Sequence, residues 1–265
     1  MTYTLAGLDD PVRGWGLRDE SWIVAGQLGR LGEETWFQLG DRDIATHIVR
    51  TARLRAGASL SDITLAIARS LGVRATILPM SNDDVRTELL TDDGWLAFQE
   101  YFVHRHQEPA VREVRFVGID RAQATARVRG ELGFADGIVI GPSNPIVSIG
   151  PILALEGIRE LLETARRGGV PIIAVSPIVA GKALKGPADR MLASLGHEPT
   201  ALGVARLYAG LATGFVLDVA DAALAPEIAR LGLRAFVVDT IMTDDPSRVA
   251  VARSILDAIA ELRAA

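Results

Sequence analysis

The second half of this sequence alternates between buried-strand patterns and helical patterns. Short apolar runs that end in turn signals predict four strands, at 137–141, 171–175, 215–217 and 235–238. Continuous apolar runs of this kind are typical of strands that are buried on both faces. Because helical segments lie between the strands, we predict an α/β fold with a doubly wound, mostly parallel, Rossmann-like sheet.

Two helices in this half have recognisable ends. The first is expected to end at Gly168 and Gly169, and its apolar stripe consists of Ile152, Leu155, Leu162 and Ala165. The last helix is expected to begin with Asp245 as N-cap and Pro246 as its first residue. Its apolar stripe consists of Val251, Ile255, Ile259 and Leu262.

The first half is less regular. Its spacing predicts helices at 43–56, 60–71 and 94–106, and strands at 74–78, 87–90 and 111–118. No repeat, low-complexity tract or linker separates these segments. We therefore predict one domain over residues 1–265, with a helical insertion lobe at approximately 40–118.

Composition narrows the class of protein. The chain has 265 residues, of which 49% are hydrophobic, so a sizeable core is expected. Its 28 basic residues against 33 acidic ones give a net charge of −5, which argues against a nucleic-acid partner. The absence of cysteine excludes disulfides and thiolate chemistry. No apolar stretch reaches the roughly 20 residues of a membrane span, and no secretory signal is present, so we expect a cytoplasmic protein without membrane partners.

The strongest candidate site is the turn that follows the strand at 137–141. Gly141 permits close backbone approach or a positive φ, and Ser143 and Asn144 supply short polar groups. A helical pattern begins directly after this turn, and helix N-termini favour anions. The turn therefore indicates a phosphorylated small molecule, with an ordinary capping turn as the alternative.

Three other segments could contribute to a site. The loop after the strand at 171–175 carries Ser176, Lys182 and Lys185, and its lysines could neutralise phosphate or simply be solvated. The turn at 78–84 carries Met80 and Ser81, and Met80 could cover an aromatic ring or belong to the core. Trp15 lies between two glycines near Arg18, where it could stack on a ligand or be buried.

Several other chemistries find no support in the sequence. No His, Asp and Glu residues have convincing metal-ligand spacing. The sequence has no nucleophile elbow, no Walker loop and no glycine fingerprint after a strand, so a dinucleotide oxidoreductase is disfavoured.

The order of the motifs resembles the 2-phospho-L-lactate transferase family, which acts in the biosynthesis of the deazaflavin coenzyme F-420. The match runs nearly from end to end. Its motifs stand at 3–7, 13–20, 39–47 (Leu-Gly-Asp-Arg-Asp-Ile-Ala-Thr-His), 78–81 (Leu-Pro-Met-Ser), 98–103, 141–145 with 148–153, 175–182 and 240–243. The motif at 39–47 is similar to the actinobacterial branch, whose donor carries phosphoenolpyruvate instead of phospholactate.

The resemblance implies a reaction and roles. The terminal ribityl hydroxyl of a deazaflavin acceptor attacks a guanosine diphosphate ester, GMP leaves, and Mg²⁺ takes part. The donor nucleotide would be bound by Gly141, Ser143, Asn144, Ser176, Lys182 and Lys185. The acceptor would be bound by Trp15, Arg18, Met80 and Ser81. The family is typically homodimeric, so a homodimer is expected.

The chain also departs from the family pattern. Family members carry a longer N-terminal segment, with a glycine-rich turn after a first strand and an aspartate pair expected to bind metal and acceptor. Because this sequence has no such segment, its catalytic and metal residues are unknown, and we expect this form to be poorly soluble or inactive. The alternative function is a non-catalytic regulator of the same fold that binds nucleotides or nucleotide sugars.

Overall fold

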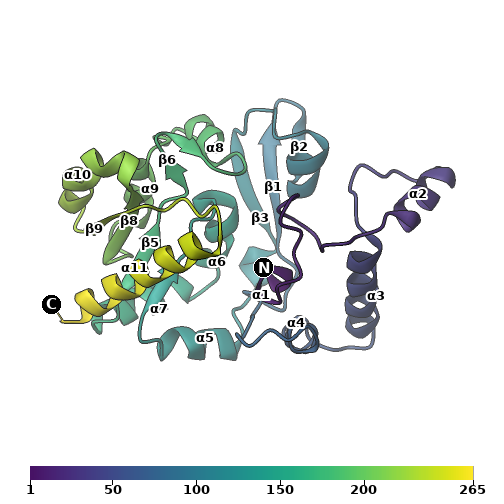
Figure 1. Cartoon of the computed structure of the whole chain (residues 1–265), viewed down its shortest axis with the longest axis horizontal. Coiled ribbons are helices and arrows are strands. Elements are labelled where there is room, and N and C mark those ends of the chain that lie inside the picture. The colour runs from purple at the N-terminus through teal and green to yellow at the C-terminus, as the bar shows by residue number, and fades with distance from the viewer. Residues whose placement is uncertain (265) are drawn as a thin grey trace. The chain divides into compact units, whose positions relative to one another are not determined.

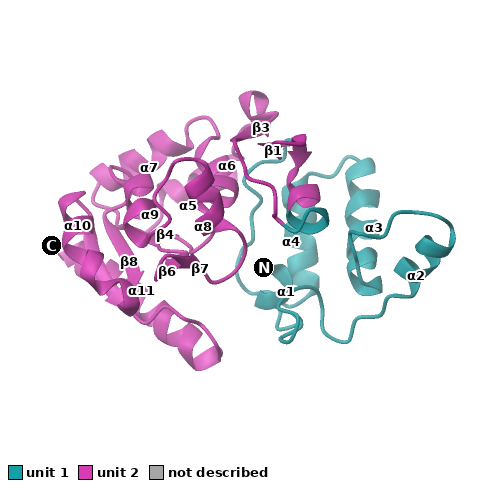
Figure 2. Ribbon diagram, turned by 90° about the horizontal axis from the view of Figure 1, so that it is seen from above, with its two compact units in different colours: residues 1–84, 102–106 teal, residues 85–101, 107–265 magenta. Residues whose placement is uncertain are grey.

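The computed structural model describes residues 1–264, which divide into two compact units (Figure 2). Unit 1 comprises Met1–Asp84 and Phe102–His106. Unit 2 comprises Val85–Tyr101 and the chain from Gln107 onward.

Unit 1 consists mainly of helices (Figure 1). They are α1 (Thr2–Leu5), α2 (Ile23–Arg30), α3 (Asp41–Arg55) and α4 (Leu60–Ser70). Ala68 of α4 packs with Val73 and Ile77 in a small apolar core. The strand predicted at 74–78 is wrong, because this segment is irregular although Ile77 is buried.

The main sheet of unit 2 has four parallel strands in the order β4-β5-β8-β9. They are β4 (Ile138–Ile140), β5 (Ile172–Val175), β8 (Gly214–Asp218) and β9 (Arg234–Val238). All four predicted strands of the second half are thereby confirmed. In the register, Ile138 lies opposite Ile172, and Gly214 lies between Ile173 and Arg234.

Both faces of this sheet are buried. On one face, Ile173, Val175 and Val216 pack against Ala258 of α11 (Asp245–Ala264). The predicted stripe of α11 is confirmed, since Ile255, Ile259 and Leu262 pack here as well and Val251 is buried. Residues of the opposite face are also fully buried, among them Ile172, Ala174 and Phe215. The predicted α/β class with a parallel sheet is confirmed.

The predicted helix end at Gly168 and Gly169 is confirmed, since α7 (Ile158–Arg167) has Gly168 as its C-cap, but two other features of the predicted helices differ. The stripe that begins at Ile152 belongs to two helices, α6 (Gly150–Leu153) and α7 (Ile158–Arg167), because Gly157 has a φ of 77° between them. The last helix is capped by Asp244, whose Oδ1 accepts the Ser247 N–H at 2.8 Å, one residue before the expected cap. The remaining helices of unit 2 are α5 (Ala126–Gly133), α8 (Ala188–Ser194), α9 (Ala201–Tyr208) and α10 (Ala225–Arg230), with short π or 3-10 turns η2 (Ile119–Arg121), η3 (Pro145–Ile149) and η4 (Val219–Leu224). The π turn η1 (Glu100–His104) begins in unit 2 and ends in unit 1.

Unit 2 also contains two antiparallel sheets. The first has the order β2-β1-β3, from β1 (Arg86–Thr91), β2 (Gly94–Ala97) and β3 (Glu113–Val117). It confirms the strands predicted at 87–90 and 111–118, but the helix predicted at 94–106 is wrong at its start, where β2 lies. The second is the hairpin of β6 (Ile178–Val179) and β7 (Lys182–Ala183).

Candidate functional site

Polar residues follow each strand of the parallel sheet at its carboxyl edge. Ser143 follows β4, Ser176 follows β5, Asp218 ends β8, and Thr240 follows β9. Because the strands are parallel, these residues lie along one edge, where open α/β sheets bind their ligands. The family resemblance predicts the donor nucleotide at this edge.

Asn144 fixes the turn after β4. Its Oδ1 accepts the N–H groups of Ile146 and Val147 at 2.9 and 3.2 Å, which caps η3, and its Nδ2 lies 3.5 Å from Sδ of Met191. Asn144 therefore uses its amide oxygen within the turn.

Ser143 and Gly141 are the open positions of the same turn. Ser143 is exposed, its N–H donates to the Gly141 carbonyl at 2.7 Å, and its hydroxyl has no hydrogen-bond partner among the described residues. Gly141 does not have the positive φ that the sequence allowed, and a Cβ there would meet nothing within 4 Å. The turn thus offers a free hydroxyl beside open space.

The segment after β5 supplies cations. Ser176 is buried, and its hydroxyl donates to the Ile178 carbonyl at 2.8 Å, so it shapes the chain instead of facing solvent. The Lys182 side chain is 81% exposed, with Nζ 3.4 Å from Oδ2 of Asp189. Lys185 is exposed as well. Two solvent-facing ammonium groups therefore follow the strand next to β4.

Two buried aspartates also lie at this edge, and no sequence motif singled them out. Asp218 Oδ2 accepts the N–H and the hydroxyl of Thr240 at 2.8 and 2.7 Å, and Oδ1 accepts the Ala220 N–H at 2.9 Å. Asp221 Oδ2 accepts the Ala180 N–H at 3.0 Å. Asp218 is the last residue of the buried strand β8 and Asp221 lies three residues later in η4, and this position at a strand end was the available signal.

The hydrogen bonds of Asp218 outweigh the cost of its burial. Burial removes water from the carboxylate and by itself raises its pKa, but the donors from Ala220 and Thr240 lower the pKa below the ordinary 3.8. Asp218 is therefore held as a carboxylate that ties the end of β8 to the chain after β9.

The residues expected around the acceptor lie in unit 1. Trp15 is 51% exposed, and its ring meets Trp22 edge-on at 6.0 Å. The guanidinium of Arg13 lies 5.3 Å from each indole centroid, a contact that the sequence did not reveal. Arg18 donates from Nη2 to the Gly7 carbonyl and so holds the segment after α1.

Met80 and Ser81 lie in the turn before unit 2 begins. Met80 is half-buried, while Ser81 is buried with its hydroxyl 3.1 Å from Oδ2 of Asp83. The Ser81 hydroxyl also accepts the Asp83 N–H at 3.1 Å. All four acceptor candidates thus belong to unit 1, whereas the six donor candidates belong to unit 2, and their ligand roles stay predictions.

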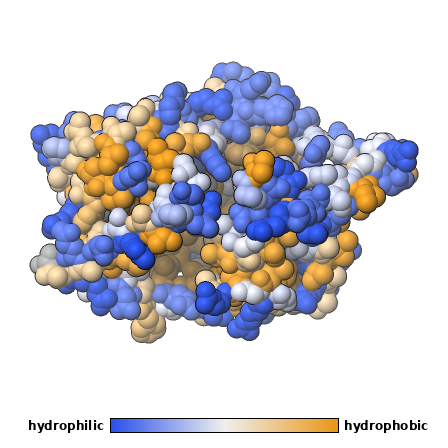
Figure 3. Space-filling view, viewed as in Figure 1, coloured by the Kyte–Doolittle hydropathy of each residue, from blue (hydrophilic) through white to orange (hydrophobic). Residues whose placement is uncertain are grey.

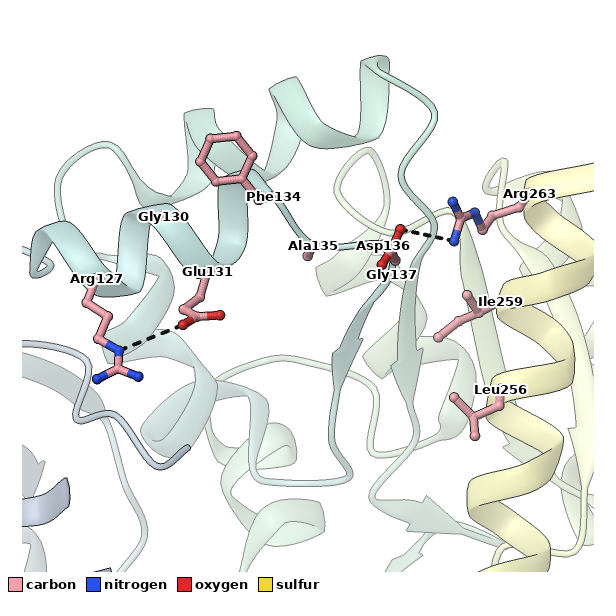
Figure 4. A pocket seen from close by; sticks show the side chains of 10 residues that line it. All are labelled: Arg127, Gly130, Glu131, Phe134, Ala135, Asp136, Gly137, Leu256, Ile259 and Arg263. Carbon is pink, nitrogen blue, oxygen red and sulfur yellow. Dashed lines mark ion pairs between the residues drawn. The ribbon is translucent and has the colours of Figure 1, made fainter. Parts of the chain in front are cut away.

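A cavity of about 800 Å³ lies in unit 2 near the amino end of β4 (Figure 4). Its lining comes from α5, from α11 and from the segment that enters β4. Two ion pairs flank it, Arg127 with Glu131 at 3.7 Å and Arg263 with Asp136 at 3.3 Å. Because it lies at the amino end of β4, it is separate from the turn at Gly141.

The magnesium ion implied by the resemblance stays a prediction. Among residues 1–264, no group of three or more His, Asp or Glu side chains could hold a metal ion. The carboxylate of Asp218 accepts hydrogen bonds on both oxygens and belongs to no such group. No described helix has the length and apolar character needed to cross a membrane.

A family model described as 2-phospho-L-lactate transferase CofD matches residues 21–247. The chain belongs to this family of transferases. The resemblance seen in the sequence motifs is therefore confirmed, and so is the expectation of an enzyme.

Curated relatives cover most of the chain. A phosphoenolpyruvate transferase from Streptomyces griseus subsp. griseus is 42% identical over 270 residues, covering 100% of this chain and 84% of the relative. One from Mycobacterium ulcerans is 45% identical over 223 residues, covering 82% and 67%. A 2-phospho-L-lactate transferase from Methanosarcina mazei is 37% identical over 258 residues, covering 97% and 84%.

Solved structures agree on the fold. Protein BH3568 from Bacillus halodurans aligns with a TM-score of 0.58 at 15% identity, covering 96% of this chain and 82% of that protein. At this identity the likeness supports the α/β architecture alone.

Proposed function

We propose that the chain transfers a three-carbon phosphoester group from a guanosine diphosphate ester to the terminal ribityl hydroxyl of a deazaflavin and releases GMP. Family membership supports the reaction class. The observation that carries the donor site is the free Ser143 hydroxyl after β4 together with exposed Lys182 and Lys185 after β5. A hydroxyl donor and two cations on neighbouring strand ends suit a diphosphate.

The chemistry needs positioning and charge more than a covalent nucleophile. The acceptor hydroxyl oxygen bonds to the β-phosphorus, the bond from that phosphorus to the bridging oxygen breaks, and GMP leaves with the bridging oxygen while the hydroxyl proton is released. The lysines would neutralise the diphosphate, and Ser143 would orient it. Trp15 and Met80 would offer apolar surface to the flat acceptor ring.

We propose phosphoenolpyruvate as the three-carbon group of the donor. The relatives named phosphoenolpyruvate transferase are 42% and 45% identical to the chain, against 37% for the 2-phospho-L-lactate transferase of Methanosarcina mazei. The motif Leu39–His47 also resembles the actinobacterial branch.

Two measurements test the proposal. Calorimetric titration with GDP tests the donor site alone, and GMP release with the deazaflavin and each guanosine diphosphate ester tests transfer and donor preference. We expect GDP binding that Lys182→Met weakens, and faster release from the phosphoenolpyruvate ester. Crystals soaked with GDP that place the nucleotide far from Ser143 would contradict the donor site. Binding of sugar nucleotides without any GMP release would favour the non-catalytic regulator instead.

A further inference from the structure

The tip of the β6–β7 hairpin holds a residue in a costly conformation. Ala180 has a φ of 49° and Gly181 a φ of 76°, so both central residues of this two-residue turn are left-handed. Turns of this kind favour Asn-Gly or Gly-Gly, because a Cβ at positive φ crowds the backbone. An alanine here costs about 1–2 kcal/mol relative to an ordinary conformation.

A buried carboxylate compensates for this conformation. Asp221, in η4 after β8, is 8% exposed, and its Oδ2 accepts the Ala180 N–H at 3.0 Å. A hydrogen bond to a charged acceptor is stronger than one to a neutral acceptor. The aspartate thus joins the end of β8 to the tip of a hairpin that begins three residues after β5.

The tip of the β6–β7 hairpin orients the exposed side chain of Lys182. Lys182 is the first residue of β7 and follows the left-handed pair directly, so the turn geometry sets the direction in which its side chain leaves the backbone. Its Nζ also meets Asp189 of α8 at 3.4 Å while the side chain stays 81% exposed. Strained backbone that the surrounding structure supports is typical of functional sites.

We propose that Asp221 is a positioning residue that, through the Ala180 N–H, holds the β6–β7 hairpin so that Lys182 reaches the phosphates of a nucleoside diphosphate ester. This inference rests on the donor site proposed above. Asp221 itself touches no substrate and acts through Lys182. A residue that only stabilised the fold would lower the melting temperature without changing phosphate affinity.

GDP titrations of paired variants test this role. Asp221→Ala is expected to weaken GDP binding about tenfold, which is close to the loss expected for Lys182→Met. Adding Ala180→Gly to Asp221→Ala should restore affinity to within about twofold, because glycine adopts positive φ without the crowding. Asp221→Asn keeps an acceptor oxygen and should retain most of the affinity, and it serves as the test if the alanine variant does not fold.

A matched control separates affinity from stability. Thr213→Val removes the hydroxyl that accepts the Ile172 N–H at 2.9 Å, at the amino end of the sheet. It should lower the melting temperature without changing GDP affinity.

A double variant tests whether Asp221 acts through Lys182. In the Lys182→Met background, Asp221→Ala should cause no further loss of GDP affinity.

The possible results distinguish the two proposals. Two results would overturn the positioning role alone, provided that the wild type binds GDP. One is an Asp221→Ala variant whose GDP affinity equals that of the wild type, and the other is an additive loss of affinity when Asp221→Ala is combined with Lys182→Met. Failure of the wild-type chain to bind GDP would overturn the donor site and the positioning role together.

Discussion

At the residue scale, the polar side chains that the sequence marks at the strand ends divide into two kinds. Asn144 and Ser176 make their hydrogen bonds inside the turns that carry them. Ser143 and Lys185 face solvent. The sequence alone could not show which side chains bond within their own turn and which face solvent. A short polar side chain after a strand serves equally well as a cap or as a ligand contact. In the proposed donor site, the exposed residues are therefore the ones expected to contact the nucleotide, and the buried ones shape the turns that carry them.

Two substitutions of Asn144 test separately whether it caps η3 and whether phosphates bind beside it. Asn144→Ala should lower the free energy of unfolding by about 1 kcal/mol, because η3 loses its cap. Asn144→Asp keeps the accepting oxygen and should preserve stability, yet it should weaken GDP binding by placing a negative charge beside the phosphates. Urea unfolding and GDP titration measure the two effects. Equal GDP affinity in the aspartate variant and the wild type would remove this turn from the donor site.

The carboxylate of Asp218 is expected to stabilise the folded chain in a way that is lost at acidic pH. Its pKa in the folded chain is lower than the ordinary 3.8, so the carboxylate favours folding at any pH above that value. The contribution is lost as pH falls below 3.8 and through the folded pKa. Asp218→Asn should therefore be less stable than the wild type near neutral pH, and the gap should narrow at about pH 3. Urea midpoints across this range measure it, and a gap independent of pH would contradict the assignment.

At the scale of elements, sequence patterns predicted the parallel strands of the second half more accurately than the helices and strands of the first half. The strands β5 and β8 are buried at every position, so each reads as an uninterrupted apolar run. The β1–β2 hairpin was missed, although Asp93-Gly94 is a hairpin signal, because the apolar residues after it also fit a helix. Thr91 pairs with Gly94 there, and Gly94 has a φ of 96°. The buried aspartates were missed because only tertiary contacts show which carboxylates accept hydrogen bonds.

Two helical glycines should respond to alanine in opposite directions. A Cβ at Gly203 of α9 would lie 1.9 Å from the Glu198 carbonyl oxygen, so Gly203→Ala should destabilise the chain by about 1–3 kcal/mol. Gly130 of α5 has open space at the same position, so Gly130→Ala should stabilise it by about 0.5–1 kcal/mol. Thermal unfolding of the two variants measures both effects. A stable Gly203→Ala variant would contradict the close approach at α9.

At the scale of the whole molecule, apolar side chains reach the surface among polar ones (Figure 3). In unit 2 they include Phe134, which is 92% exposed, Leu256 at 63% and Val139 at 45%. Phe134 and Leu256 line the cavity at the amino end of β4. Within the described residues, β4 pairs only with β5, so its other edge carries unpaired backbone groups. An open strand edge beside exposed apolar side chains favours association between chains.

This surface predicts that the chain associates in a concentration-dependent manner. Phe134→Lys should reduce the association, because a charge beside an open edge opposes pairing with another chain. Val12→Lys is the matched control, since Val12 is 93% exposed and lies in unit 1. Light scattering across a concentration series measures the mass of each variant. A wild-type chain that stays monomeric throughout, or a Val12→Lys variant that dissociates as well as Phe134→Lys, would show that the edge at β4 does not drive association. An effect of Phe134→Lys alone would assign the contact to the open side of β4. Because Phe134 lies before the amino end of β4 and the proposed donor site lies at the carboxyl ends of the strands, this variant is expected to bind GDP as the wild type does.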